Sequence, residues 1–281
     1  MKKIVVTGGA GFVGANLCKK LASLGYSVSS IDNYSTGFEK NHVMGVRYFN
    51  KDISKNFGLE AICQDADVIY HLAALARIQP SFVHPDEYFE SNIAGTFNLC
   101  EVSRKCRIPI ILSGSSSHHS GKFKNPYTFT KDISEELLML YDRIYNIDQS
   151  IARFYNVYGP NHIEEGEYAT VIAKWDKAHR EKRPLTIYGN GSKERDFTHV
   201  DDIVDGLIKI WKKGSYGVIF ELGRGRKFSL QDVAELYKPS FGIQYEEDKK
   251  GEAQSVECDS SLAKELLNWE PKFNLEDWIK K

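Results

Sequence analysis

A tyrosine and a lysine stand four residues apart in a stretch with a helical pattern, and together they could move a proton. Asn125 and Pro126 precede Tyr127; asparagine is a good helix cap, and proline suits the first helical position. Tyr127 and Lys131 then lie on one helix face. A free tyrosine has a pKa of about 10 and is a poor base at neutral pH, but a fixed ammonium beside it favours the phenolate. The pair predicts general acid–base chemistry; an exposed Tyr–Lys pair is the alternative.

Hydroxyl side chains gather before this pair, where a predicted strand at 109–113 ends. Residues 113–119 read Ser-Gly-Ser-Ser-Ser-His-His. Open parallel sheets bind ligands at the carboxyl ends of their strands. The run of hydroxyls therefore indicates a position at the mouth of the sheet, with a flexible serine-rich loop as the alternative.

Glycines near the start of the chain indicate an anion site. An apolar strand at 3–7 runs into Gly8, Gly11 and Gly14, and a helical pattern follows over 15–24. A backbone without Cβ atoms can approach a pyrophosphate closely, and the N–H groups at the helix start favour the anion. This arrangement predicts a dinucleotide turn, with a purely structural glycine turn as the alternative.

An acidic residue after the second strand narrows the choice of dinucleotide. The strand at 27–31 ends in Asp32. A carboxylate there can accept hydrogen bonds from a ribose diol, and it disfavours the 2′-phosphate of NADP. We therefore predict NAD as the cofactor.

Further strands indicate the framework that holds these residues. Apolar segments at 46–49, 68–72 and 151–154 read as strands, and 86–105 reads as a long helix. This alternation predicts an α/β fold with a doubly wound parallel sheet, a Rossmann fold. We expect an NAD-binding domain over residues 1–155 and a smaller, mostly substrate-binding α/β lobe over 156–281. The helix near 200–213 is expected to pack back on the larger domain.

Two of these strand ends supply additional candidate contacts. Asp52 and Ile53 follow the third strand and suit the adenine edge, although Asp52 could instead cap a turn. Small residues after the fourth strand, Ala73 and Ala74, let a ligand lie close. His71 beside them is predicted to be a packed residue.

Composition excludes several classes of protein. The chain has 281 residues and a formal net charge of −1, which gives no electrostatic reason to expect nucleic acid or a membrane surface as a partner. No apolar run approaches the roughly 20 residues of a membrane span. The first strand begins at once, so we expect no signal peptide. Five cysteines without a C-x-x-C pair indicate reduced thiols in a cytoplasmic protein. Asp201 and Asp202 read as a helix start, so no metal is predicted.

Together these motifs resemble the extended short-chain dehydrogenase/reductase family, in its nucleotide-sugar epimerase branch. The resemblance covers nearly the whole chain and is carried by residues 7–14, 32–33, 71–74, 127–131, 153–159 and 195–197. The stretch 168–175 is most similar to UDP-N-acetylglucosamine 4-epimerases. The family implies NAD-dependent 4-epimerisation of a UDP-hexose, with glucose and galactose or their N-acetylamino counterparts as the sugar, through a transient 4-keto intermediate.

The resemblance also implies site residues. NAD would be bound by Gly8, Gly11, Phe12, Val13, Gly14, Asp32, Asn33, Asp52, Ile53, Leu72, Ala73, Ala74, Asn92, Tyr127, Lys131 and Tyr155. The UDP-sugar would be bound by Ser116, Asn156, Thr170, Val171, Trp175, Thr186, Tyr188, Arg195, Lys249 and Val256.

Alignment with the family places Ser116 at the catalytic hydroxyl position beside Tyr127 and Lys131, with Ser115 second. The family's usual R-P-G-D reads Lys249-Lys250-Gly251-Glu252 here, so Lys249 would replace a phosphate-binding arginine. Val256 falls at the position that gates the space beside the sugar's C2 substituent. The loop from Ser116 to Tyr127 is shorter than usual.

Other members of the family mark the alternatives. A 4,6-dehydratase would carry Asp-Glu after the hydroxyl residue, a decarboxylase a Glu and a GDP-sugar 3,5-epimerase a Cys, whereas residues 117–119 are Ser-His-His. A 4-ketoreductase uses the same Ser, Tyr and Lys and stays open. A non-catalytic dinucleotide-binding interaction protein is the reading from a different class. It is disfavoured because such relatives usually lose the Tyr or the Lys.

The family also implies a homodimer. Helices near 86–105 and 126–145 pair across a two-fold axis in the family, and apolar candidates for that surface are Phe97, Leu137, Leu138 and Tyr141. Some of these side chains must instead cover the sheet.

Overall fold

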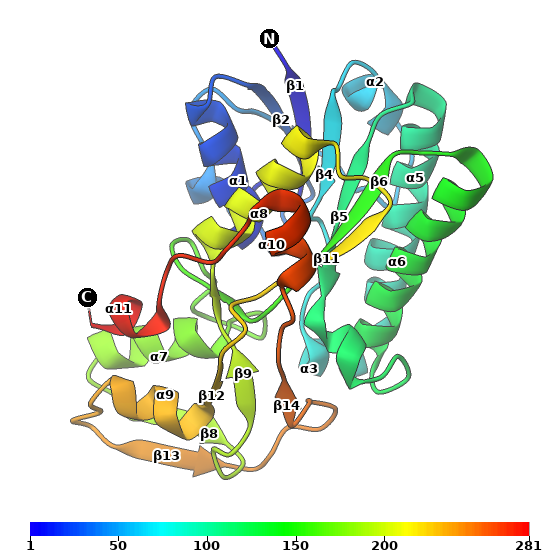
Figure 1. Cartoon of the computed structure of the whole chain (residues 1–281). Coiled ribbons are helices and arrows are strands. Elements are labelled where there is room, and N and C mark those ends of the chain that lie inside the picture. The colour runs from blue at the N-terminus through cyan, green and yellow to red at the C-terminus, as the bar shows by residue number, and fades with distance from the viewer. Residues whose placement is uncertain (281) are drawn as a thin grey trace.

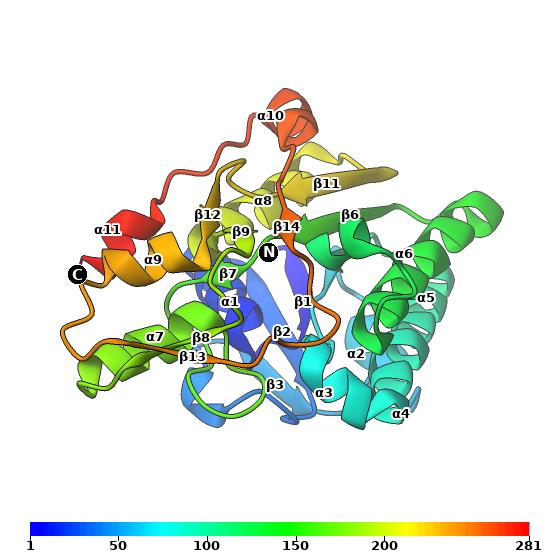
Figure 2. The same cartoon turned by 90° about the horizontal axis from the view of Figure 1, so that it is seen from below.

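A seven-stranded parallel sheet forms the centre of the larger part of the molecule (Figures 1 and 2). The computed structural model describes residues 1–280. The strand order is β11-β6-β5-β4-β1-β2-β3, and every neighbouring pair is parallel. The strands are β1 (Lys3–Thr7), β2 (Ser27–Asp32), β3 (Arg47–Asn50), β4 (Val68–His71), β5 (Ile110–Ser115), β6 (Gln149–Phe154) and β11 (Val218–Leu222). The predicted fold class is confirmed.

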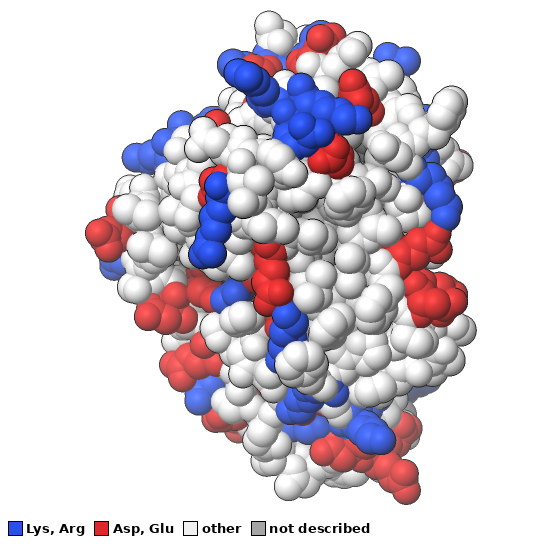
Figure 3. All heavy atoms as spheres, turned by 90° about the vertical axis from the view of Figure 1, so that its right-hand side faces the viewer, with Lys and Arg blue, Asp and Glu red and all other residues white. Residues whose placement is uncertain are grey.

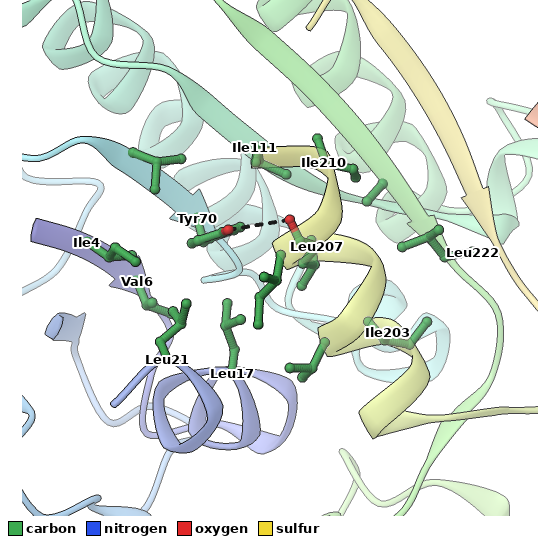
Figure 4. Close-up of a cluster of buried hydrophobic side chains, with 14 of the residues drawn as sticks. Ile4, Val6, Leu17, Leu21, Tyr70, Ile111, Ile203, Leu207, Ile210 and Leu222 are labelled. Atoms are coloured by element: carbon green, nitrogen blue, oxygen red, sulfur yellow. Dashed lines mark hydrogen bonds between the residues drawn. The ribbon is translucent and has the colours of Figure 1, made fainter. Parts of the chain in front are cut away.

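Helices cover both faces of this sheet, so its central strands β1, β4 and β5 are almost wholly buried. One face carries α1 (Phe12–Ser23), α8 (Val200–Lys213) and α10 (Ser261–Leu267), and the other carries α2 (Leu59–Cys63), α5 (Gly95–Cys106) and α6 (Pro126–Tyr145). Figure 4 shows the first face, where Leu17 and Leu21 of α1 meet Leu207 of α8 over β1. There the Tyr70 hydroxyl donates a hydrogen bond of 3.3 Å to the Leu207 carbonyl. Residues after 155 therefore contribute α8, β11 and α10 to the larger part of the molecule, which is built around the seven-stranded sheet.

The region predicted as one helix at 86–105 is divided. It consists of α4 (Pro85–Tyr88), a π-helical segment (Phe89–Ala94) and α5. Asn92 lies in the π segment, and its buried side chain binds the backbone of Leu75 and the hydroxyl of Thr130. π-helical turns are rare and occur mostly as single turns inside α-helices, often at functional sites. Here the π turn ties the helix to the segment that leaves β4.

The smaller lobe packs below the carboxyl edge of the sheet (Figure 1). Its core lies between three helices and two small sheets. The helices are α7 (Val171–Arg180), α9 (Leu230–Leu236) and α11 (Leu275–Ile279). One sheet pairs β8 (Leu185–Tyr188) with β13 (Ile243–Glu246), and the other has β9 (Glu194–Asp196) between β12 (Lys227–Ser229) and β14 (Ser255–Val256). A parallel pair, β7 (Val157–Tyr158) and β10 (Thr198–His199), follows β6 and precedes α8. Within residues 1–280, the helices are all too short or too polar to cross a membrane.

Candidate active site

A cleft of about 1030 Å³ lies between the carboxyl edge of the large sheet and the smaller lobe. Its wall on the sheet side comes from the ends of β1, β2, β4, β5 and β6, and its other wall comes from α7, β8, β9 and β14. This is the place where open parallel sheets bind ligands. The cleft brings together most of the residues that the sequence singled out.

The glycine turn after β1 leaves no room for side chains. Gly8 has φ +74°, and a Cβ there would lie 2.8 Å from the Ala73 nitrogen. A Cβ on Gly14 would lie 2.0 Å from the Gly8 carbonyl oxygen. The tight turn therefore feeds directly into α1, whose first N–H groups border the cleft. Such a turn fits the pyrophosphate of a dinucleotide.

Asp32 ends β2 and is held by backbone donors. The Ala10 nitrogen donates to Oδ2 at 2.9 Å, and the Tyr34 nitrogen donates to Oδ1 at 2.8 Å. The carboxylate is thus fixed at the edge of the cleft, about where a ribose diol would lie beyond the glycine turn. Together with the glycine turn, it fits a dinucleotide with an unmodified ribose.

Most of the predicted cofactor residues line the cleft, and three do not. Those that line it are Gly8, Gly11, Phe12, Val13, Gly14, Asp32, Asn33, Ile53, Leu72, Ala73, Ala74, Tyr127 and Lys131. Asp52 lies behind Asn33, whose amide donates to it at 3.0 Å, and it also caps Ser54. The Asn92 side chain hydrogen-bonds Leu75 and Thr130. Tyr155 is fully buried and donates to Glu221 at 2.8 Å. Asp52, Asn92 and Tyr155 therefore hydrogen-bond neighbouring residues and do not line the cleft.

Both residues of the predicted acid–base pair line the cleft. Asn125 accepts from the Thr128 nitrogen at 2.8 Å and Pro126 opens α6, so the helix begins as expected. The Tyr127 hydroxyl donates to Ser115 Oγ at 3.0 Å. The buried Lys131 ammonium donates to the carbonyl of Ser113. Two neighbouring strand-end serines and one helix face therefore form a compact group.

The hydroxyl beside Tyr127 belongs to Ser115, whereas the alignment had favoured Ser116. The strand β5 runs two residues beyond the predicted end, and its last residue, Ser115, pairs with Phe154 of β6. Ser116 begins the short 3₁₀ turn Ser116–Ser120 and lines the cleft without a hydrogen bond to Tyr127. Because β5 continues to residue 115, Ser115, the second candidate, is the serine that reaches Tyr127.

The electrostatics of this group are dominated by burial. Burial raises the pKa of Tyr127, while the Ser115 hydrogen bond and the charge of Arg77 act in the opposite direction. Burial lowers the pKa of Lys131 to about 8, against the opposing effect of Glu135. His71 is packed between Thr7 and Thr96, and burial lowers its pKa to about 3, so it is neutral. Tyr127 therefore needs an additional positive charge nearby to act as a base at neutral pH.

All of the predicted substrate residues line the cleft: Ser116, Asn156, Thr170, Val171, Trp175, Thr186, Tyr188, Arg195, Lys249 and Val256. Thr170 caps α7 by accepting from the Ala173 nitrogen, so that helix begins at Val171. The indole of Trp175 donates to the Thr186 carbonyl at 2.8 Å. These contacts set the wall formed by the smaller lobe.

Cationic side chains of the smaller lobe also face the cleft. Arg195 on β9 lies 3.2 Å from Glu252, and the Lys249 ammonium lies 3.6 Å from the ring centroid of Tyr188. Burial lowers the pKa of Lys249, and the neighbouring charge of Lys174 adds to the effect. Positive groups beside an aromatic ring suit a nucleoside diphosphate.

Arg77 and Tyr168 are cleft residues that the sequence did not single out for their own chemistry. Arg77 stands five residues after Leu72 in an otherwise apolar segment. The sequence signal that could have identified Arg77 is a charged residue in the loop that follows a central strand.

One group of side chains resembles a metal site. Ligand-type atoms of His118, Asp132 and Glu135 all lie within 4.8 Å of one another. However, Arg153 pairs with Glu135 at 2.7 Å, and His118 Nδ1 lies 3.0 Å from Asp132 Oδ1. These pairs account for the cluster as an ion-pair network.

The Rossmann fold, the glycine turn and the group formed by Ser115, Tyr127 and Lys131 define the extended branch of the short-chain dehydrogenases/reductases. The chain belongs to the NAD-dependent epimerase/dehydratase family, whose model matches residues 4–223. The family predicted from the sequence motifs is confirmed, and NAD, the predicted cofactor, is the cofactor of this family.

Relatives with different reactions match nearly the whole of this chain. The crystal structure of a UDP-glucose 4-epimerase from Thermotoga maritima is 30% identical and superposes with a TM-score of 0.94, over 99% of this chain and 96% of the other. UDP-glucuronate 4-epimerase of Thermodesulfobacterium geofontis is 30% identical over 99% of this chain and 94% of its own length. UDP-glucuronic acid decarboxylase 1 of Arabidopsis thaliana is 31% identical over 99% and 68%, respectively. The comparisons thus define a class of enzymes acting on UDP-sugars.

Proposed function

We propose that this protein is an NAD-dependent 4-epimerase of UDP-hexoses, interconverting UDP-glucose and UDP-galactose, their N-acetylamino counterparts, or both. The observation that carries the proposal is the 3.0 Å hydrogen bond between Tyr127 and Ser115 in the cleft that begins at the glycine turn. This pair can hold one sugar hydroxyl and remove its proton. Epimerase relatives of about 30% identity support the same reaction.

In this mechanism Tyr127 removes the proton from O4 as the hydrogen on C4 leaves. Ser115 hydrogen-bonds O4 and keeps it within reach of the phenol. Lys131, held by Ser113, supplies the fixed positive charge near Tyr127 and would also hold a ribose hydroxyl. Bound NAD⁺ supplies a hydride acceptor and a positively charged ring, which opposes the effect of burial on the tyrosine pKa. After the 4-keto sugar has turned over, C4 regains the hydride on its opposite face and Tyr127 returns the proton to O4, so no net redox change occurs.

The smaller lobe would hold the UDP part. Arg195 and Lys249 offer charge to the diphosphate, and Tyr188 offers a ring beside them. The Lys249 ammonium is a point charge, so it would bind phosphate without the fork of an arginine. Asn156, Thr170, Val171, Trp175 and Thr186 complete the wall. These roles follow from the family resemblance and from the position of each residue in the cleft.

Two related reactions are the competing assignments. A 4-ketoreductase would use the same three catalytic side chains, but it would consume a reduced cofactor at every turnover. A decarboxylase, the reaction of the Arabidopsis relative, would carry a Glu just after the catalytic hydroxyl. After Ser115, the catalytic hydroxyl proposed here, this chain has Ser116 and Ser117. The residue pattern therefore favours epimerisation.

A product assay without added reductant tests the proposal. The purified protein is incubated with UDP-glucose or UDP-N-acetylglucosamine, each alone, and the sugar products are separated. We expect the C4 epimer of at least one substrate to form to equilibrium. A protein that changes sugars only when a reductant is supplied would be a ketoreductase. A protein that binds the dinucleotide and converts no UDP-sugar would be an interaction protein.

We further propose a homodimer formed through α5 and α6. Figure 3 shows this side of the molecule, where uncharged atoms fill broad areas between charged groups. Phe97, Leu140 and Ile144 are 46%, 51% and 64% exposed. Leu138 and Tyr141, named with Phe97 from the sequence, are buried against the sheet instead. Sedimentation at micromolar concentration should give about twice the chain mass of 31.9 kDa; a single-chain mass would contradict the dimer.

A further inference from the structure

Arg77 is held in the cleft wall by contacts that leave most of its guanidinium unused. It stands where the chain leaves β4 and enters α3 (Ile78–Val83). Its Nε donates to the Tyr168 carbonyl at 2.8 Å, and its own carbonyl accepts from the Tyr88 hydroxyl at 2.8 Å. Among residues 1–280, no hydrogen-bond partner meets Nη1 or Nη2. Two donor nitrogens of a well-anchored cation are therefore available to a ligand.

Arg153 and Arg195 have carboxylate partners, and Arg77 does not. Arg153 pairs with Glu135 at 2.7 Å, and Arg195 pairs with Glu252 at 3.2 Å. No carboxylate oxygen of the described residues lies within 4.0 Å of the Arg77 guanidinium. Glu252 is near enough to affect it electrostatically, but that carboxylate already serves Arg195 and Lys193. A partly buried cation without a counter-charge is costly unless a ligand provides one.

The position of Arg77 identifies which part of a substrate it would meet. The Tyr88 ring, whose hydroxyl binds the Arg77 carbonyl, packs edge-on against the Tyr127 ring with centroids 6.3 Å apart. The charge of Arg77 also acts on the pKa of Tyr127, in the direction that favours the phenolate. Arg77 therefore lies at the sugar end of the cleft. The cations proposed for the diphosphate, Arg195 and Lys249, come from the smaller lobe.

We propose that Arg77 determines sugar specificity by binding a carboxylate on the hexose, so that the preferred substrates are UDP-sugars with an acidic group next to C4. The proposal rests on the proposed function, because it takes Tyr127 to mark the position of O4. In the ring, C4 is bonded to C3 and C5. The acidic group is therefore either the C6 carboxylate of a hexuronic acid or a carboxylate carried on O3. The planar fork of an arginine matches such a group in two parallel hydrogen bonds, which a neutral hydroxyl cannot equal.

Two simpler roles for Arg77 make different predictions. If Arg77 only anchored the Tyr168 backbone, or only favoured the phenolate of Tyr127, its removal would weaken the reaction of every UDP-sugar alike. A role in tuning Tyr127 would also move the pH profile of kcat for all substrates together. Recognition of a carboxylate instead changes the ratio between acidic and neutral sugars. The ratio is therefore the quantity to measure.

The test uses two matched pairs of UDP-sugars with the NAD-loaded full chain. UDP-glucuronic acid differs from UDP-glucose only in the carboxylate at C6, and UDP-N-acetylmuramic acid differs from UDP-N-acetylglucosamine only in the acidic substituent on O3. Dissociation constants are measured by calorimetry, and kcat/KM is measured by product separation. We expect the acidic member of at least one pair to be favoured by about 10- to 100-fold. The pair that shows the preference identifies the position of the carboxylate.

Three variants test whether the preference for acidic sugars is due to Arg77. Arg77→Met keeps the length and much of the packing of the side chain but removes its charge, and it should bring the acid-to-neutral ratio close to one. Arg77→Lys keeps the charge without the fork and should retain part of the preference. Arg47→Met, at an exposed arginine of β3 outside the cleft, is the matched control and should leave the ratio as in the wild type. Equal binding of acidic and neutral sugars by the wild type would overturn the proposal, and so would an Arg77→Met variant with an unchanged ratio.

Binding and turnover together separate this proposal from the proposed function. If acidic UDP-sugars bind preferentially through Arg77 but none is converted to its C4 epimer, the recognition role stands and the epimerase assignment fails. If neutral and acidic sugars are epimerised with the same kcat/KM and bind equally well, the epimerase assignment stands and the role of Arg77 fails.

Discussion

The Tyr127 hydroxyl donates a 3.0 Å hydrogen bond to Ser115 Oγ, across the gap between the start of α6 and the end of β5. This contact joins the only two elements that carry the proposed proton chemistry within the described chain, residues 1–280. It also orients the phenol toward the cleft before any sugar binds. A proton acceptor that is positioned in advance loses little entropy in the reaction.

Tyr127→Phe should lower kcat by about 10²- to 10⁴-fold, since the change removes the general base and little packing. NAD should stay bound, because the glycine turn and Asp32 are untouched. The measurement is steady-state turnover together with the NAD content of the purified variant. Near-normal turnover would show that another group takes the proton.

Ser115→Ala and Ser116→Ala form a matched pair that tests which serine acts. Ser115→Ala removes the hydroxyl that meets Tyr127 and should reduce kcat roughly tenfold or more. Ser116→Ala removes a neighbouring hydroxyl of the same cleft and should have a much smaller effect. Steady-state kinetics of both variants decide the matter. The reverse order of effects would restore Ser116 as the catalytic hydroxyl.

The difference between these two serines shows where sequence reasoning ended. Motifs with fixed local spacing, such as Gly8 to Gly14 and Tyr127 with Lys131, were located correctly because turn and helix geometry follow directly from the spacing. The end of β5 depends on how far β6 continues to pair with it, and Ser115 pairs with Phe154. That partner is distant in the sequence, so a pattern ending at residue 113 could not reveal it.

Other differences have the same physical origin. The strand β11 is not among the predicted elements, since its place at the edge of the sheet depends on pairing with β6, which is distant in the sequence. Asn92 is a predicted cofactor contact, but in the π-helical segment its side chain hydrogen-bonds Leu75 and Thr130 instead. The missing counter-charge of Arg77 is visible only when the surrounding carboxylates are placed. Side-chain partners across the fold are what the sequence pattern leaves undetermined.

Asp32 should set the choice of cofactor. Its carboxylate would repel the 2′-phosphate of NADP, so the wild type should bind NAD more tightly. Asp32→Ala should reduce this preference by at least about tenfold, the order of one lost charge interaction in a partly buried site. Asp32→Asn keeps an acceptor for the Ala10 nitrogen and separates the charge from the loop contact. Calorimetric affinities for both dinucleotides give the answer, and equal wild-type affinities would refute the assignment.

Val256 should leave room for an acetamido group at C2. It lies on β14, in register with Arg195, and lines the cleft. We expect UDP-N-acetylglucosamine to be epimerised at least as well as UDP-glucose. Val256→Tyr should selectively remove the acetylated activity, since added bulk costs the larger substrate more. The kcat/KM ratio of the two neutral sugars is the readout. A wild type that uses UDP-glucose and ignores the acetylated sugar would place the gate elsewhere.

The fate of the hydrogen on C4 tests the central claim most directly. A UDP-sugar carrying deuterium at C4, either UDP-glucose or UDP-N-acetylglucosamine, is incubated with the NAD-loaded protein in ordinary water without reductant, and the epimer is analysed by mass spectrometry and NMR. Epimerisation through a 4-keto sugar that stays in the cleft predicts inversion at C4 with the deuterium retained on that carbon. Loss of the deuterium to solvent, or conversion only when external reductant is added, would contradict the account.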